Sequence, residues 1–236
     1  MVSKTSLTDN IKAFRSAEIR TSLAEKPDLL SVRDDRGRSW LHLLCASQPK
    51  DDYDAQASIE IAAHLLDLGL GLDDPAFSEG AWLATPLWFS ISRGRNLALA
   101  KFLLRRGCNP NYCLYAAVWN EDLASIALLL GHGALVDDDS AQGVTPFVEA
   151  IGWSKFAPAQ ALLEAGADPD RRDGKGRTAL HMMLKKGSAP THFEMLVTHK
   201  ARGDIRDADG RTAIELLRRK RDPIWHAIAD RLVAKD

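Results

Sequence analysis

The sequence predicts an all-α fold in which pairs of short helices stack as a solenoid, with short β-hairpin fingers between the pairs. Three observations predict it. A turn motif of Gly, any residue and Ser/Thr before an apolar run occurs four times, a second Gly-containing motif follows each copy at a similar distance, and the copies recur with a period near 33 residues. A fixed period of this length indicates an array of small repeats that can bury their apolar faces only by stacking.

The turn motif predicts where the first helix of each pair begins. In three copies an Asp stands three residues before the Gly. A Ser or Thr hydroxyl ahead of an apolar run accepts a hydrogen bond from an unpaired N–H group of the first helical turn, so each copy predicts a turn followed by a helix start. The copies are "RDDRGRSWLHLL" (33–44), "SAQGVTPFVEA" (140–150), "RRDGKGRTALHMML" (171–184) and "DADGRTAIELL" (207–217).

The second motif predicts where the second helix of each pair ends. An apolar pair is followed after a few residues by Gly or its equivalent, which favours a helix stop. The anchor positions Gly107, Gly133, Gly166 and Lys200 are separated by 26, 33 and 34 residues. The copies are "KFLLRRGCNPN" (101–111), "ALLLGHGALVD" (127–137), "QALLEAGADPD" (160–170) and the altered "EMLVTHKARGD" (194–204).

Together the two motifs resemble those of the ankyrin-repeat family, whose units open with D-x-x-G-x-T-P-L-H and close with LL-x-x-GAD-x-N. "TALH" at 178–181 and "TPF" at 145–147 match the opening, and "GADPD" at 166–170 matches the close. The resemblance covers essentially the whole chain. It implies that His42 and His181 serve packing and hydrogen bonding between repeats, and that a partner is held by finger tips and by the concave face at the ends of the first helices.

We expect a single array over residues 1–236 with seven helix pairs. Residues 1–33 form a degenerate N-terminal capping repeat and residues 205–236 the C-terminal capping repeat. The interior repeats fill residues 34–204, at approximately 34–73, 74–110, 111–137, 138–170 and 171–204.

Departures from the period predict local changes. The stretch 47–56 is expected to be a loop inserted between two helices, and the finger before Thr85 is lengthened, with Trp82 near its tip. In the unit that starts at 111, "GCNPN" runs directly into "YCLYAAVW", so we expect no hairpin there. Gly94 and Gly187 are expected to stop first helices.

Composition excludes several protein classes. The net charge is −1, 45% of the residues are hydrophobic, and no apolar run approaches the roughly eighteen residues that a membrane span needs. The N-terminus has no apolar leader segment, so we expect a cytoplasmic protein. Cys45, Cys108 and Cys113 lack metal-ligand spacing, and we expect reduced thiols, no metal and no cofactor.

The stretch "DGKGRTALH" (173–181) raises the question of an enzyme, because a Gly-rich turn before a helix can cradle a phosphate. Gly176 follows Lys175 where the phosphate-loop pattern requires Ser or Thr, and the same turn recurs along the chain. Helix capping therefore explains it better. No two histidines stand at i, i+4, and Cys45 with His42 has no third partner, so we expect no catalytic residues and no enzyme.

The candidate partner-binding residues follow from the family's concave face. Eight residues after each Ser/Thr-equivalent position stands a row of side chains at the end of the first helix, and two tryptophans occupy its middle. Tryptophan and arginine are enriched in binding hot spots. Packing of Trp119 and Trp153 against neighbouring units is the alternative. The predicted binding residues are Trp82, Arg93, Trp119, Trp153, Lys185, Lys186, Arg219 and Lys220.

Charge is distributed unevenly and suggests the partner. Residues 171–221 hold 14 Lys/Arg and 6 Asp/Glu, a net charge of +8, which leaves −9 for the rest of the chain. We expect a non-catalytic scaffold or adaptor that is monomeric when unbound and binds another protein with an acidic surface. A dedicated inhibitor or immunity-type protein is one alternative. A binder of nucleic acid or another acidic ligand through the basic C-terminal repeats is a weaker one.

Overall fold

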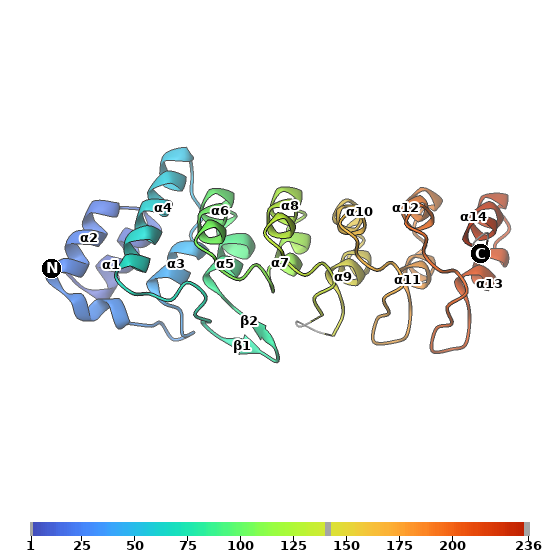
Figure 1. The fold of residues 1–236 in the computed structure, drawn as a ribbon, viewed down its shortest axis with the longest axis horizontal. Helices are drawn as coiled ribbons and strands as arrows, with labels where there is room; N and C mark the ends of the chain where they lie inside the picture. Colours follow the sequence, from blue (N-terminus) through green and yellow to red (C-terminus); the bar gives the residue numbers. More distant parts are fainter. Residues whose placement is uncertain (1, 140–142, 234–236) are drawn as a thin grey trace. The chain divides into compact units, whose positions relative to one another are not determined.

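The protein is described by a computed structural model that covers residues 2–139 and 143–233, and within these residues the helices form seven consecutive pairs (Figure 1). The predicted all-α fold of helix pairs is confirmed. The first helices are α1 (Lys4–Lys12), α3 (Trp40–Ala46), α5 (Pro86–Phe89), α7 (Leu114–Trp119), α9 (Pro146–Gly152), α11 (Ala179–Lys186) and α13 (Ala213–Arg218). The second helices are α2 (Ser16–Glu25), α4 (Asp52–Asp67), α6 (Leu97–Arg105), α8 (Leu123–Gly131), α10 (Phe156–Glu164), α12 (Phe193–Thr198) and α14 (Pro223–Val233).

Contacts divide the chain into two compact units. Unit 1 comprises Met1–Asn120 and Ala127–Ala134, and unit 2 comprises Glu121–Ile126 and Leu135–Asp236. In unit 1, α3 packs on α1 and α5, and α4 packs on α2 and α6. In unit 2, α11 packs on α9 and α13, and α12 packs on α14. First helices therefore stack on first helices, whereas the array over residues 1–236 and its repeat boundaries stay predictions.

The apolar positions of the repeated motifs form the core. In four of the first helices the residue two places after the Ser/Thr cap is fully buried, and so is one leucine in five of the second helices. Burying one such side chain contributes roughly 2 kcal/mol. These positions are Leu41, Leu87, Phe147 and Leu180 in the first helices, and Leu65, Leu103, Leu129, Leu162 and Leu196 in the second. No helix that the structure describes is long and apolar enough to cross a membrane.

The recurring Asp of the turn motif has a structural role. The Asp34 carboxylate accepts hydrogen bonds from the backbone N–H groups of Arg36 and Arg38, both at 2.9 Å, and from Nε of Arg38 at 2.7 Å. Asp173 and Asp207 make the same bonds with the backbone and side chain four residues later. The carboxylate therefore closes the turn and neutralises the arginine. In the copy at 140–150, residues 140–142 lie outside the described residues.

Replacing Asp34 with Asn is expected to destabilise the protein by about 1 kcal/mol, because Asn supplies no charge for the Arg38 guanidinium. Burial opposes ionisation of Asp34, but the hydrogen bonds from Arg38 and Arg36 outweigh it and lower its pKa. The charged carboxylate thus stabilises the fold above its unfolded pKa, and this contribution is lost as the pH falls. Urea unfolding at pH 7 measures the effect. The adjacent exposed Asp35→Asn is the matched control, and equal losses in both variants would contradict this role.

The expected loop at 47–56 is correct for residues 47–51, which join α3 to α4, and wrong for residues 52–56, which are helical. The extra residues lengthen a helix instead, and α4 begins at Asp52 and runs for 16 residues. The Asp51 side chain accepts from the backbone N–H of Asp54, and Asp52 and Asp54 place negative charge in the first turn, where the helix dipole favours it.

The two glycines that were predicted to end first helices, Gly94 and Gly187, differ in backbone conformation. Gly187 ends α11 in a left-handed conformation, with φ of +69°, as expected. Gly94 does not end its helix in this way. It closes a π-helical turn, η2 (Ser90–Gly94), and the left-handed residue is Arg95, with φ of +46°. A Cβ atom on Gly94 would lie 2.1 Å from the carbonyl oxygen of Cys45, so this position is glycine because α3 approaches it closely.

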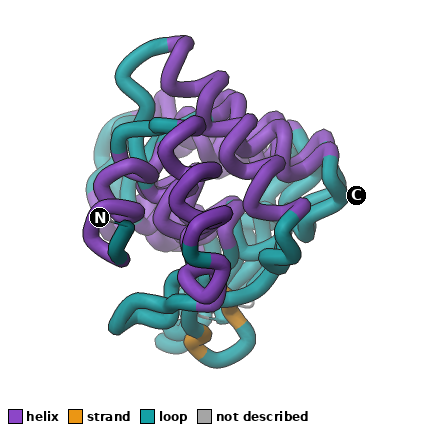
Figure 2. The backbone as a smooth tube through the Cα atoms, turned by 90° about the vertical axis from the view of Figure 1, so that its left-hand side faces the viewer, coloured by secondary structure: helices purple, strands orange, loops and turns teal. Residues whose placement is uncertain are grey.

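The lengthened finger is confirmed. β1 (Ser78–Glu79) pairs antiparallel with β2 (Trp82–Leu83), and in Figure 2 these strands are orange and lie away from the helices of unit 1. The finger expected to be missing is also absent from the described residues, where α7 starts at Leu114 directly after a short turn.

Candidate partner-binding surface

The structure places the predicted row at the ends of the first helices. Arg93 lies in η2, Trp119 is the last residue of α7, Trp153 directly follows α9, and Lys186 is the last residue of α11. Arg93 and Lys186 are exposed, Trp119 is 61% exposed and Trp153 is half-buried. Each side chain therefore borders the same part of its own helix pair.

The remaining predicted residues lie at the end of the chain or in the finger. Lys185 precedes Lys186 and is exposed, while Arg219 and Lys220 follow α13, the first exposed and the second half-buried. The Lys220 ammonium lies 4.5 Å from the centre of the Trp225 ring, a cation–π contact that holds it in place.

Trp82 belongs to an aromatic cluster of unit 1. It starts β2, is half-buried, and its ring packs edge-to-face on Trp88 at 5.0 Å and against Phe77 at 5.8 Å. Its Nε1 donates to the carbonyl oxygen of Tyr112 at 3.3 Å. Trp82 therefore anchors the finger, and Phe77 beside it, a residue that sequence reasoning did not single out, is 44% exposed.

Lys186 is held beside Trp153. Its ammonium donates to the carbonyl oxygen of Gly152 and to Oγ of Ser154, the latter at 3.2 Å. These residues flank Trp153 on both sides. The structure thus holds the Lys186 ammonium at the chain segment that carries Trp153.

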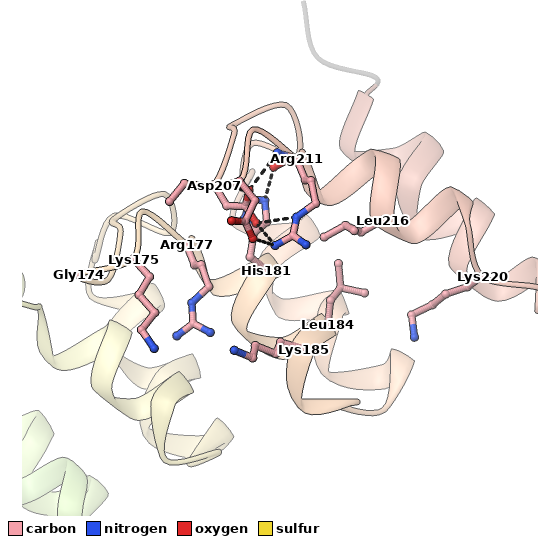
Figure 3. Close-up of a pocket in the computed structure, with 12 residues that line it drawn as sticks. Gly174, Lys175, Arg177, His181, Leu184, Lys185, Asp207, Arg211, Leu216 and Lys220 are labelled. Atoms are coloured by element: carbon pink, nitrogen blue, oxygen red, sulfur yellow. Dashed lines mark hydrogen bonds and ion pairs between the residues drawn. The ribbon is translucent and has the colours of Figure 1, made fainter.

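A cleft of about 840 Å³ in unit 2 contains further predicted residues (Figure 3). We call it the basic cleft. Its walls are two finger loops and the faces of α11 and α13. It is lined by Gly174, Lys175, Arg177, His181, Leu184, Lys185, Asp207, Ala208, Asp209, Arg211, Leu216 and Lys220.

The charged groups of the basic cleft fall into two sets. Arg177 forms an ion pair with Asp173, and Arg211 forms ion pairs with Asp207 and Asp209. By contrast, the ammonium groups of Lys175 and Lys185 make no hydrogen bond or ion pair with the described part of the chain. Between these charges lie the half-buried side chains of Leu184 and Leu216. The sequence pointed to Lys185 and Lys220, but nothing in it showed that two leucines would form a floor beside them.

The two histidines of the turn motif make hydrogen-bond contacts within the fold, as the resemblance implied. His42 contacts Ser39 Oγ at 2.8 Å through Nδ1 and the carbonyl oxygen of Asp74 at 2.8 Å through Nε2. His181 contacts Thr178 Oγ1 at 2.9 Å and the carbonyl oxygen of Arg211 at 3.0 Å. Each imidazole ties the start of one helix pair to the finger of the next, which is a structural role.

Cys45 and Cys108 are not reactive thiols, and the described residues form no metal site. Burial raises the pKa of the Cys45 thiol and that of Cys108, the latter to about 12, so neither forms a thiolate readily near neutral pH. Among residues 2–139 and 143–233, no group of three His, Cys, Asp or Glu residues is arranged to hold a metal ion.

Comparisons with known proteins show which sequences the chain is similar to. No family model matches the chain. Human inversin is 34% identical over 100 residues, which are 42% of this chain and 9% of inversin. The phosphocholine transferase AnkX of Legionella pneumophila is 26% identical over 144 residues, 56% of this chain and 15% of AnkX. The chain therefore spans less than a sixth of the length of these relatives.

Solved structures agree in fold over almost the whole chain. The ankyrin repeat domain of human ASB11 has a TM-score of 0.71 at 20% identity and covers 98% of this chain and 99% of its own. The ankyrin repeat domain of Bcl-3 has a TM-score of 0.72 at 17% identity, covering 95% and 97%. Together with the repeated helix pairs, these matches show that the chain has the fold of an ankyrin repeat domain.

Proposed function

We propose that the protein is a non-catalytic interaction module, a scaffold or adaptor that binds a partner protein through the ends of its first helices. Ankyrin-repeat domains generally mediate protein–protein interaction. The observation that carries the proposal is the row at these helix ends, where Trp119 is 61% exposed and Trp153 lies beside the positioned ammonium of Lys186. Tryptophan is one of the residue types enriched in binding hot spots.

A catalytic role has less support. The match to AnkX, named as a phosphocholine transferase, involves 15% of that protein. The motif histidines contribute both ring nitrogens to contacts within the fold, and Cys45 and Cys108 are buried. We therefore propose binding without chemistry, by a cytoplasmic protein that is monomeric before it meets its partner.

Replacing Trp153 with Ala is expected to weaken partner binding at least tenfold without unfolding the protein, because truncating a hot-spot residue costs about 2 kcal/mol or more of binding free energy. Affinity capture from source cells compares the wild-type chain with Trp119→Ala and Trp153→Ala, and thermal unfolding is measured for each. Tyr53→Ala is the matched control, since this aromatic residue is 80% exposed and lies in the first turn of a second helix, α4.

The outcomes separate the candidate roles. Several partners that are retained by the wild type and lost from both tryptophan variants support an adaptor. One stoichiometric enzyme partner supports an inhibitor instead. A large loss of thermal stability with binding retained contradicts the row as a binding surface. Salt-sensitive binding of a labelled oligonucleotide supports a nucleic-acid binder.

A further inference from the structure

We propose that the basic cleft of unit 2 binds an extended acidic peptide segment, with its carboxylates at Lys175 and Lys185 and an aliphatic side chain over Leu184 and Leu216. This inference rests on the proposed function, because it names the part of the partner that one site recognises. It also adds Lys175 and the two leucines to the residues predicted to bind.

The shape of the basic cleft suits a chain segment. Finger residues 174–177 and 207–211 form two walls, and α11 and α13 form the others. In Figure 3 the side chains of Lys175, Arg177 and Lys185 extend toward the same region, while Lys220 stands apart on the α13 side. A volume of about 840 Å³ falls in the range of well-formed ligand pockets and accommodates a few residues of a peptide.

The charge of the basic cleft selects an anion. The described residues that line it include five cations and two carboxylates, and both carboxylates are bonded to Arg211. An arriving anion therefore meets uncompensated ammonium groups on Lys175 and Lys185. Walls of low dielectric concentrate this field within a cleft.

The arginines of the basic cleft are not available to hold a phosphate. A guanidinium fork binds phosphate in bidentate fashion, but the forks of Arg177 and Arg211 are occupied by Asp173 and Asp207. The groups that remain are lysine ammonium ions, which act as point charges. Single-stranded nucleic acid would also require aromatic stacking surfaces, and the described lining contains no Phe, Tyr or Trp.

The leucines on the floor of the basic cleft suit a ligand that also carries an aliphatic side chain. Leu184 on α11 and Leu216 on α13 are half-buried, so each keeps apolar surface in contact with water. Covering it would contribute roughly 25 cal/mol per Å². In an extended peptide successive side chains point to opposite sides, so one aliphatic residue can cover the leucines while its neighbours reach the lysines.

The test uses a fluorescein-labelled peptide of about ten residues, made of Asp and Glu with two Leu, and measures its binding to the full chain by fluorescence anisotropy. We expect saturable binding that weakens with salt, and an affinity about tenfold lower for the double variant Lys175→Ser/Lys185→Ser. Lys101→Ser, which removes an exposed lysine from α6, is the matched control and is expected to bind like the wild type.

Two further arms test the specificity. Leu216→Ser is expected to weaken the Leu-containing peptide several-fold but not an all-acidic peptide, and retained binding of the latter shows that the variant is folded. Substituting phosphoserine for the acidic residues is expected to give no gain. The proposal is overturned if the acidic peptide does not bind, or if a peptide with Asn and Gln in place of Asp and Glu binds equally well. It is also overturned if the phosphopeptide binds more tightly, or if the Lys175→Ser/Lys185→Ser variant and Lys101→Ser lose the same affinity.

The failures of the two proposals are distinguishable. A partner protein captured equally by wild type and by the Lys175→Ser/Lys185→Ser variant, but lost from Trp153→Ala, overturns the basic cleft and leaves the interaction module intact. A peptide that binds as expected while no variant of the row affects capture supports the basic cleft and contradicts the row.

Discussion

Replacing Gly94 with Ala is expected to lower the free energy of unfolding by about 3 kcal/mol or more, one of the largest effects available from a single methyl group. The added Cβ would lie 2.1 Å from the carbonyl oxygen of Cys45 and 3.3 Å from that of Ser47. Both obstacles are backbone atoms, which cannot rotate aside as a side chain would. Relief requires α3 to move away from η2, and these elements pack directly on each other in unit 1.

Urea unfolding followed by circular dichroism measures this loss. Gly131→Ala is the matched control, because Gly131 ends α8 and a Cβ there meets nothing within 4 Å. In that position alanine gains helix propensity, so the control is expected to be neutral or slightly stabilising. If the Gly94→Ala variant is as stable as the control, α3 and η2 can move apart at little cost in free energy, which contradicts this prediction.

Gly94 also shows where sequence reasoning about the fold ends. The repeated caps, apolar positions and Asp turns are local, and each recurs several times, so they were predictable. The role of Gly94 depends on the distance to a helix in the preceding pair, and its sequence neighbours contain no sign of that approach. The lengthened α4 was missed for a similar reason, because a run of polar and acidic residues reads as a loop until Asp51 is seen to cap a helix.

The candidate site was predictable in position but not in detail. The family pattern locates the ends of the first helices, and through them Lys185 and Lys220 of the basic cleft. It does not show that Arg177 and Arg211 are occupied by aspartates of their own turns while Lys175 is not. That distinction depends on side-chain geometry, and it decides which cations of the basic cleft are left for an anion.

The second large effect is an acid-dependent loss of stability that originates at His42. Its Nδ1 accepts from the backbone N–H of Ser39 at 3.1 Å, so Nε2 carries the proton and donates to the carbonyl oxygen of Asp74. A second proton on the ring would bind Nδ1 and would point at the Ser39 N–H group, which is itself a donor. Burial lowers the pKa of His42 to about 4, and the nearby charge of Arg33 acts in the same direction, against the Asp74 hydrogen bond.

The sign follows from where the proton binds. Between pH 6.5 and about 4 the unfolded chain takes up a proton at His42 that the folded chain does not, so stability falls as the pH falls through this window. A shift of this size corresponds to about 3 kcal/mol at the acid end. Carboxyl groups whose pKa burial raises act oppositely in the same range, among them Asp73, Asp137, Glu149 and Asp170.

A comparison with His42→Gln isolates the histidine from these carboxyl groups. Glutamine three residues after a Ser cap can accept from the cap's N–H, and it does not titrate. We expect the wild type to be more stable than this variant at pH 7.5, and the difference to shrink steadily toward pH 4.5. An NMR titration of the His42 ring should place its pKa well below 6.5. A stability difference that stays constant with pH would mean that the imidazole accepts its second proton without cost, contrary to the contacts with Ser39 and Asp74.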